Sequence, residues 1–108
     1  MKYEQGPAGA VYSPRWEYMN GAVLVFDGAA SQEAVAPVTD PPTNIFVLWA
    51  DGGNVYFDIN NPIAGPGSPG YVADSSGATV GPLFVLTTVR AFSPTAGARA
   101  HIMWFRER

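Results

Sequence analysis

The sequence contains no cysteine and only one histidine, and each shortage argues against particular kinds of covalent or metal site. Without cysteine the chain has no disulfide framework, no thiolate metal site and no cysteine nucleophile. With a single histidine, a zinc site would have to be built mainly from carboxylates, which is an uncommon ligand set for this metal. We therefore expect neither a metal nor another cofactor.

Charge is also scarce. Charged residues make up 14% of the 108 residues, against roughly 25% in typical soluble domains. The net charge is −3 and the six basic residues are dispersed, so the concentrated basic face that binds nucleic acid is not expected. A surface this poor in charge predicts that part of it is covered by a partner in the working state; the alternative is a neutral surface rich in Thr, Ser and Asn.

Long apolar runs are missing as well. No run approaches the roughly 20 residues that a membrane-spanning helix needs, and residues 1–6 lack the apolar core of a secretory signal. We expect no membrane partner and no secretory signal.

Candidate catalytic residues are few and poorly grouped. His101 lies in the middle of an expected strand, where a partly exposed sheet residue is the simplest interpretation. Asp51 and Asp58 are separated by roughly 20 Å along a strand, too far to act as an acid–base pair. Asp74 sits in an expected turn without the Asp-x-Asp spacing of a calcium loop. The sequence therefore predicts a protein that is not an enzyme.

What the chain does contain is a series of short β-branched and aromatic runs separated by Gly- and Pro-rich turns. No segment of useful length shows a helical apolar period. This pattern predicts an all-β fold, a small antiparallel β-sandwich or jelly-roll-like barrel, over residues 21–108. The expected strands cover residues 22–26, 34–38 at an edge, 44–50, 54–59, 71–72, 79–80, 83–92 and 98–105.

Three of these strands carry clear face patterns. Residues 44–50 are apolar on both faces, which predicts a central strand covered on both sides. The glycines of residues 51–53 favour a β-hairpin that joins this strand to residues 54–59, where apolar and polar residues alternate. Residues 83–92 and 98–105 also alternate, which predicts two further strands with one face each toward the core.

Residues 1–20 show no regular period but are too apolar for a disordered tail. We expect an extended N-terminal arm that packs on a neighbouring subunit, with packing on its own domain or a simple first strand as alternatives. Aromatic residues are the usual energetic anchors of protein interfaces. The candidate interface residues are Tyr3, Tyr12, Trp16 and Tyr18. The aromatic residues Trp16, Tyr56 and Tyr71 also leave open a small carbohydrate- or receptor-binding module.

Residues 44–105 have a suggestive layout. The segments in order are NIFVLWADGGNVYFDIN, NNPIAGPGSPGYVADSSGATVGP, LFVLTTVRAF and SPTAGARAHIMWF. This layout resembles the small β proteins of tailed bacteriophage virions, most of all capsid decoration (cement) proteins. The resemblance implies a subunit made in the host cytoplasm that sits on the capsid surface, often as a trimer, and stabilises the major capsid protein. It implies no catalytic or ligand-binding residues, and the layout would also suit a tail or neck component.

Overall fold

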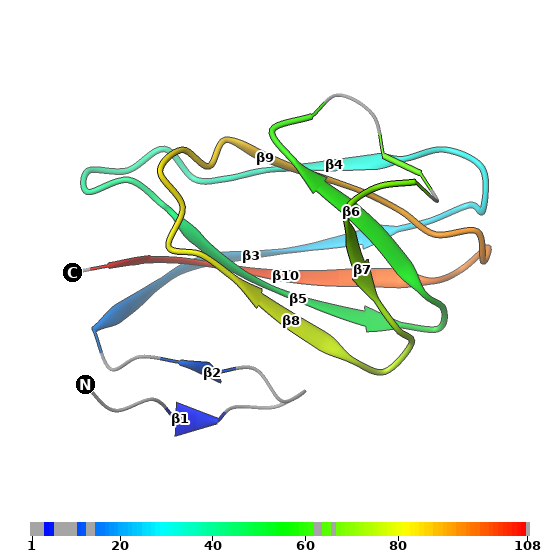
Figure 1. Ribbon diagram of the computed structural model, residues 1–108, viewed down its shortest axis with the longest axis horizontal. Helices are drawn as coiled ribbons and strands as arrows, with labels where there is room; N and C mark the ends of the chain where they lie inside the picture. The colour runs from blue at the N-terminus through cyan, green and yellow to red at the C-terminus, as the bar shows by residue number, and fades with distance from the viewer. Residues whose placement is uncertain (1–3, 6–10, 13–14, 62–63, 66, 108) are drawn as a thin grey trace.

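The computed structural model describes residues 4–5, 11–12, 15–61, 64–65 and 67–107. These residues form ten β-strands and no helix, so the all-β prediction is confirmed (Figure 1). None of them belongs to a helix capable of crossing a membrane. The first two strands pair only with each other; they are β1 (Glu4–Gln5) and β2 (Val11–Tyr12).

The other eight strands form two four-stranded antiparallel sheets that face each other (Figure 1). The first sheet has the order β3-β10-β5-β8, with β3 (Trp16–Val25), β10 (Arg99–Glu107), β5 (Ile45–Asp51) and β8 (Gly77–Val80). The second sheet has the order β4-β9-β6-β7, with β4 (Gln32–Val35), β9 (Thr88–Phe92), β6 (Val55–Ile59) and β7 (Gly70–Val72).

The strand pairing is nested. Strand β3 pairs with β10, β4 with β9, β5 with β8 and β6 with β7. The chain is thus one long antiparallel ribbon with its tip at β6–β7, and the ribbon is rolled so that β10 also pairs with β5 and β9 with β6. This is the connectivity of a jelly roll, one of the two architectures expected from the sequence.

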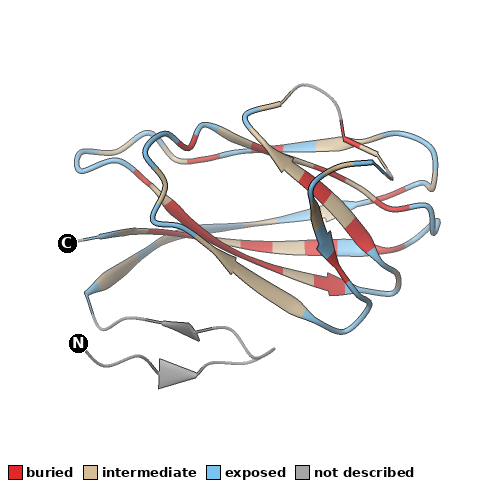
Figure 2. Cartoon of the chain, viewed as in Figure 1, coloured by how far each residue is buried: buried red, intermediate tan, exposed pale blue. Residues whose placement is uncertain are grey.

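The core lies between the two sheets, and burial alternates along the strands that line it (Figure 2). In β10 the side chains of Ala100, Ile102 and Trp104 are buried, as the alternation predicts. The Phe46 ring packs against Trp104 at 6.0 Å and edge-on against Phe57 of the second sheet at 5.8 Å. Aromatic contacts of this kind hold the two sheets at a fixed separation.

Strand β5 is buried on both faces, as predicted for residues 44–50. Phe46 and Leu48 point into the core. Ile45 and Val47 point to the outer face of the first sheet and are nevertheless 0% and 1% exposed, because they pack with Phe105 in a second apolar cluster.

The hairpin expected between residues 44–50 and 54–59 is wrong. Strands β5 and β6 lie in different sheets, and β5 already has β10 on one side and β8 on the other. Gly52 adopts a φ of 84°, so the predicted tight turn exists. It carries the chain across the sandwich, because a turn signal does not specify which strand the chain will pair with.

Residues 83–92 do not form one strand. Strand β9 begins only at Thr88. Leu86 and Val89 are both buried although they are three residues apart, a spacing that a regular strand cannot place on one face. The backbone N–H groups of Leu83 and Thr87 are bound instead by the carbonyl of Asn44 and the side chain of Asn60.

The expected boundary between arm and sandwich at residue 20 is also wrong, since β3 begins at Trp16 and pairs with β10 along its length. The register shifts between Trp104 and Phe105, and Met19 is the extra residue on β3. This β-bulge resets the alternation, so that Trp16 and Tyr18 share the outer face with Phe105. The strand expected near residues 34–38 is an edge strand, as predicted, but it covers Gln32–Val35.

Candidate functional site

A groove of about 370 Å³ opens at one end of the sandwich, and we call it the end groove. One wall is lined by residues 35–39, 42 and 43, from the end of β4 and the loop after it, and the other by residues 84–88, which lead into β9. Val38 and Phe84 are fully exposed on the two walls, and Val35 and Val85 are 65% and 60% exposed. Large apolar side chains this accessible, gathered around one concavity, mark an interaction site rather than ordinary surface.

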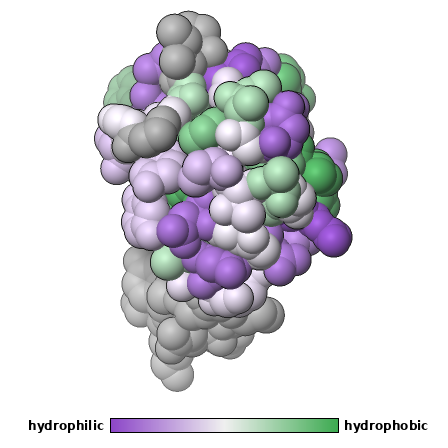
Figure 3. Space-filling model, turned by 90° about the vertical axis from the view of Figure 1, so that its right-hand side faces the viewer, coloured by the Kyte–Doolittle hydropathy of each residue, from purple (hydrophilic) through white to green (hydrophobic). Residues whose placement is uncertain are grey.

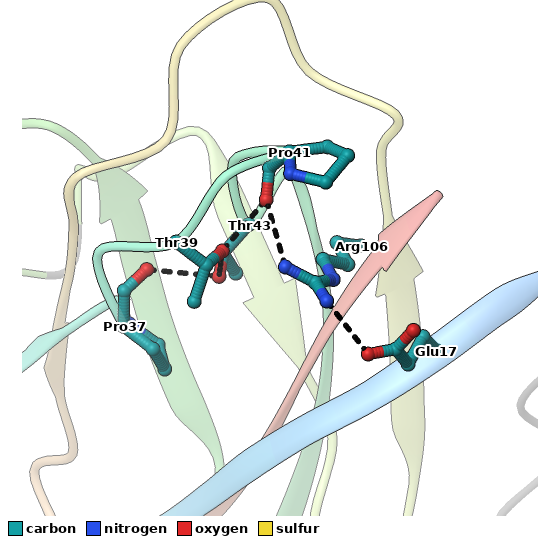
Figure 4. A network of polar contacts seen from close by, with 6 residues as sticks. All are labelled: Glu17, Pro37, Thr39, Pro41, Thr43 and Arg106. Carbon is teal, nitrogen blue, oxygen red and sulfur yellow. Dashed lines mark hydrogen bonds and ion pairs between the residues drawn. The ribbon is translucent and has the colours of Figure 1, made fainter. Parts of the chain in front are cut away.

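The first wall is held by the polar network in Figure 4. Arg106 of β10 donates to the carbonyl of Pro41 at 3.3 Å and forms an ion pair with Glu17 of β3 at 2.9 Å. Thr43, which is buried, donates its hydroxyl to the carbonyl of Pro37 at 2.9 Å, and Thr39 donates to the carbonyl of Pro41 at 2.8 Å. The loop is therefore fastened to β10 through Arg106, which Glu17 of β3 orients, and to itself.

The second wall is held by Asn60, the residue after β6. Its side-chain oxygen accepts the backbone N–H of Thr87 at 2.8 Å, the Thr87 hydroxyl at 2.8 Å and the N–H of Thr88 at 3.1 Å. Its amide group donates to the carbonyl of Val85 at 3.0 Å. Asn60 has a φ of 55°, a backbone conformation that asparagine tolerates better than most residues.

The end groove has apolar chemistry. None of its lining residues is titratable. The hydroxyls of Thr39, Thr43 and Thr87 already donate to Pro41, Pro37 and Asn60. The groove can therefore bind an uncharged apolar segment.

The opposite end of the sandwich differs in character. Figure 3 shows that end, where hydrophilic and hydrophobic residues are interspersed. Its turns contain Asp27, which accepts the backbone N–H groups of Ala29 and Ala30, and Asp74, which accepts the N–H of Gly52. These carboxylates serve the turns, and no group of three or more metal-ligating side chains occurs in the part of the chain that the structure describes.

The remaining acid–base candidates are not brought together. Asp51 and Asp58 lie in different sheets. His101 is a partly exposed sheet residue, as expected, with its Nε2 atom 3.8 Å from an Asp51 carboxylate oxygen.

Of the four predicted interface residues, Trp16 and Tyr18 are placed by the structure. Both contact Phe105 on the outer face of the first sheet, with ring centroids 6.1 Å and 5.7 Å away. Trp16 is half-buried, while Tyr18 is 57% exposed. Tyr3 lies outside the described residues, and of Tyr12 only the backbone in β2 is described.

Tyr18 lies at the same end of the sandwich as the end groove. The residue before it, Glu17, points the other way and reaches Arg106, which in turn holds Pro41 of the groove wall. Glu17, the neighbour of Tyr18 in the sequence, is thus linked to the groove wall by one ion pair and one hydrogen bond.

The groove residues Val38 and Phe84 were not among the sequence candidates. The signal that could have found them is an apolar residue inside a proline-bounded connection, as in Pro37-Val38 and Pro82-Leu83-Phe84. Such a residue has no strand neighbours that would explain its hydrophobicity.

Comparison of the chain with known protein families, curated proteins and solved structures finds no match. The resemblance to phage decoration proteins therefore stays a prediction drawn from the layout of residues 44–105.

Proposed function

We propose that this chain is a structural virion subunit, a phage head decoration protein that binds the outer capsid surface through its end groove. The observation that carries the proposal is the exposure of Val35, Val38, Phe84 and Val85 around one preformed concavity. In this role the groove takes an uncharged apolar segment of the major capsid protein.

The rigidity of the groove favours a lasting contact. Both walls are fixed by side-chain hydrogen bonds, by Arg106 and Thr43 on one side and by Asn60 on the other. A site that is ordered before binding loses little conformational entropy when it is filled. Phe84 projects fully from its wall, as an anchor residue of an interface does.

Two further features support assembly over catalysis. The groove contains no titratable side chain, and viral capsid domains are among the proteins that use the jelly-roll architecture. That likeness is one of fold. Tyr18, exposed near the same end of the sandwich, is the candidate contact between copies of the subunit, in a trimer or another oligomer.

The test is binding to heads assembled from the major capsid protein of the same genome without the decoration subunit. Heads are mixed with purified chain and pelleted, and the bound copies are counted at each concentration. We expect the double variant Val38→Asp/Phe84→Asp to bind at least 30-fold more weakly, because loss of an interface anchor costs about 2 kcal/mol or more.

The matched control is the double variant Val23→Asp/Val25→Asp, which places the same two charges on valines of β3 that are 55% and 58% exposed. We expect this variant to bind like the unmodified chain. Undiminished occupancy by the double variant, or failure of the unmodified chain to bind heads at all, would refute the proposal.

A further inference from the structure

Three aromatic side chains form one cross-strand row on the outer face of the second sheet. Phe92 of β9 lies opposite Tyr56 of β6, and Tyr56 lies opposite Tyr71 of β7. The two tyrosine rings are 5.2 Å apart and inclined by 52°, so their faces form a shallow trough. Tyr71 is 52% exposed, and Tyr56 and Phe92 are partly exposed. We call these three residues the aromatic row.

A polar row runs beside it. Glu33, Arg90 and Asp58 occupy consecutive strands of the same face. Because Arg90 and Phe92 are two residues apart on β9, the two rows lie about 7 Å apart. Arg90 forms a 2.9 Å ion pair with Glu33 and also donates to Ser31. Asp58 accepts the backbone N–H of Ile59 on one carboxylate oxygen and the side-chain amide of Asn61 on the other. Each oxygen keeps a further lone pair, so the polar row offers oriented carboxylate acceptors without a concentrated positive charge.

The size of the aromatic row matches a small ligand, since the row alone is about a third of one side of a stable protein interface. An aromatic side chain buries roughly 150–250 Å² when it is fully covered. One ring of the aromatic row is half exposed and the other two are less exposed, so a ligand could cover about 250 Å² of their surface. A stable protein interface needs about 800 Å² on each partner. The accessible surface suits a ligand of a few ring-sized units.

We propose that the aromatic row and the polar row together form a binding site for a neutral oligosaccharide. The C–H groups on the flat face of a pyranose carry partial positive charge and pack on the negative face of an aromatic ring. The hydroxyl groups at the rim of the sugar donate to the carboxylates of Glu33 and Asp58. Arg90, the cation of the polar row, is already paired with Glu33, so the polar row does not favour an acidic sugar over a neutral one.

The experiment is a titration of the ¹⁵N-labelled full chain with neutral oligosaccharides built from glucose, galactose, mannose or N-acetylglucosamine, and with a sulfated oligosaccharide for comparison. We expect at least one neutral oligosaccharide to shift the amide signals of β6, β7 and β9. Tyr71→Ala should weaken that binding on the order of tenfold, the scale of one stacked ring. Tyr71→Phe, which keeps the ring, should bind nearly as well as the unmodified chain.

Two controls separate this site from other surfaces. Tyr18→Ala removes a tyrosine of similar exposure from the first sheet and should leave sugar binding unchanged. The groove variant Val38→Asp/Phe84→Asp should also keep sugar binding, so this inference and the proposed function can fail independently. Absence of any shift with neutral sugars at millimolar concentration, binding of the sulfated sugar alone, or equal affinity of Tyr71→Ala would overturn the inference.

Discussion

Replacing Asn60 tests whether one side chain holds a wall of the end groove. The side chain of Asn60 makes four hydrogen bonds to Val85, Thr87 and Thr88. Strand β9 begins only at Thr88, so the residues before it are not held by strand pairing. The residue also occupies the left-handed backbone region, at a φ of 55°. Asn60→Ala removes the bonds and strains the backbone, whereas Asn60→Gly removes only the bonds.

The expected size of each effect follows from the geometry. A hydrogen bond contributes a net 0.5–1.5 kcal/mol or so, and these bonds are solvent-exposed, so water replaces part of each one. Four bonds at the lower end give a loss of about 2 kcal/mol for Asn60→Gly. A non-glycine residue in the left-handed region costs about 1 kcal/mol more, so Asn60→Ala should lose about 3 kcal/mol.

Urea denaturation followed by tryptophan fluorescence measures both losses. At about 4–8 °C per kcal/mol for a domain near this size, Asn60→Ala should also melt at least 12 °C below the unmodified chain. Binding to heads should fall in both variants, because the second wall of the groove loses its anchor. Equal stability of Asn60→Gly and the unmodified chain would show that the wall is held by something else.

Two further perturbations follow from the fold. Deletion of residues 1–14 should leave a cooperative thermal unfolding transition, measured by circular dichroism. Deletion of residues 1–20 should lower the melting temperature sharply, because it removes half of β3 and the Glu17 partner of Arg106. Equal melting temperatures of the two deletion variants would contradict the start of β3 at Trp16. The N–H groups of Ala30 and Ala29 hold the pKa of Asp27 below its ordinary value of 3.8. A depressed pKa adds stability above pH 3.8 that is lost as the pH falls through the folded-state pKa, so Asp27→Asn should be less stable than the unmodified chain at neutral pH and the two should converge in acid.

The presence of a strand could be predicted from the sequence where apolar and polar residues alternate. Val55 and Phe57 alternate with Tyr56 and Asp58, and the first two are buried as expected. The alternation failed at Met19, because a β-bulge moves every preceding side chain to the other face and makes the start of β3 look irregular.

The partner of each strand was harder to predict from the sequence than the strand itself. The glycine at position 52 is required by a tight turn, whether the chain returns to the same sheet or crosses to the other one. The choice depends on β10 and β8, which lie later in the sequence and occupy the two edges of β5, so that no edge is left for β6. Such competition between distant partners leaves no local signal.

The end groove could not be predicted from the sequence for the same reason. Its walls come from two loops that are distant in the sequence and meet only because β4 pairs with β9. Phe84 and Val85 looked like strand residues because they continue the apolar run of β9, while the Asn60 side chain that keeps them out of the strand could not be foreseen.

The two proposed sites are compatible on one subunit because strand geometry separates them. Thr88 borders the end groove and Phe92 lies in the aromatic row, at opposite ends of β9. Four residues of strand span about 13 Å, so a subunit held by its end would keep the outer face of its second sheet open to solvent. A capsid-bound subunit should therefore bind neutral sugars as well as the free chain does. Loss of sugar binding on heads, with the free chain still active, would mean that the capsid covers the aromatic row and that the subunit docks by its sheet face rather than by its end.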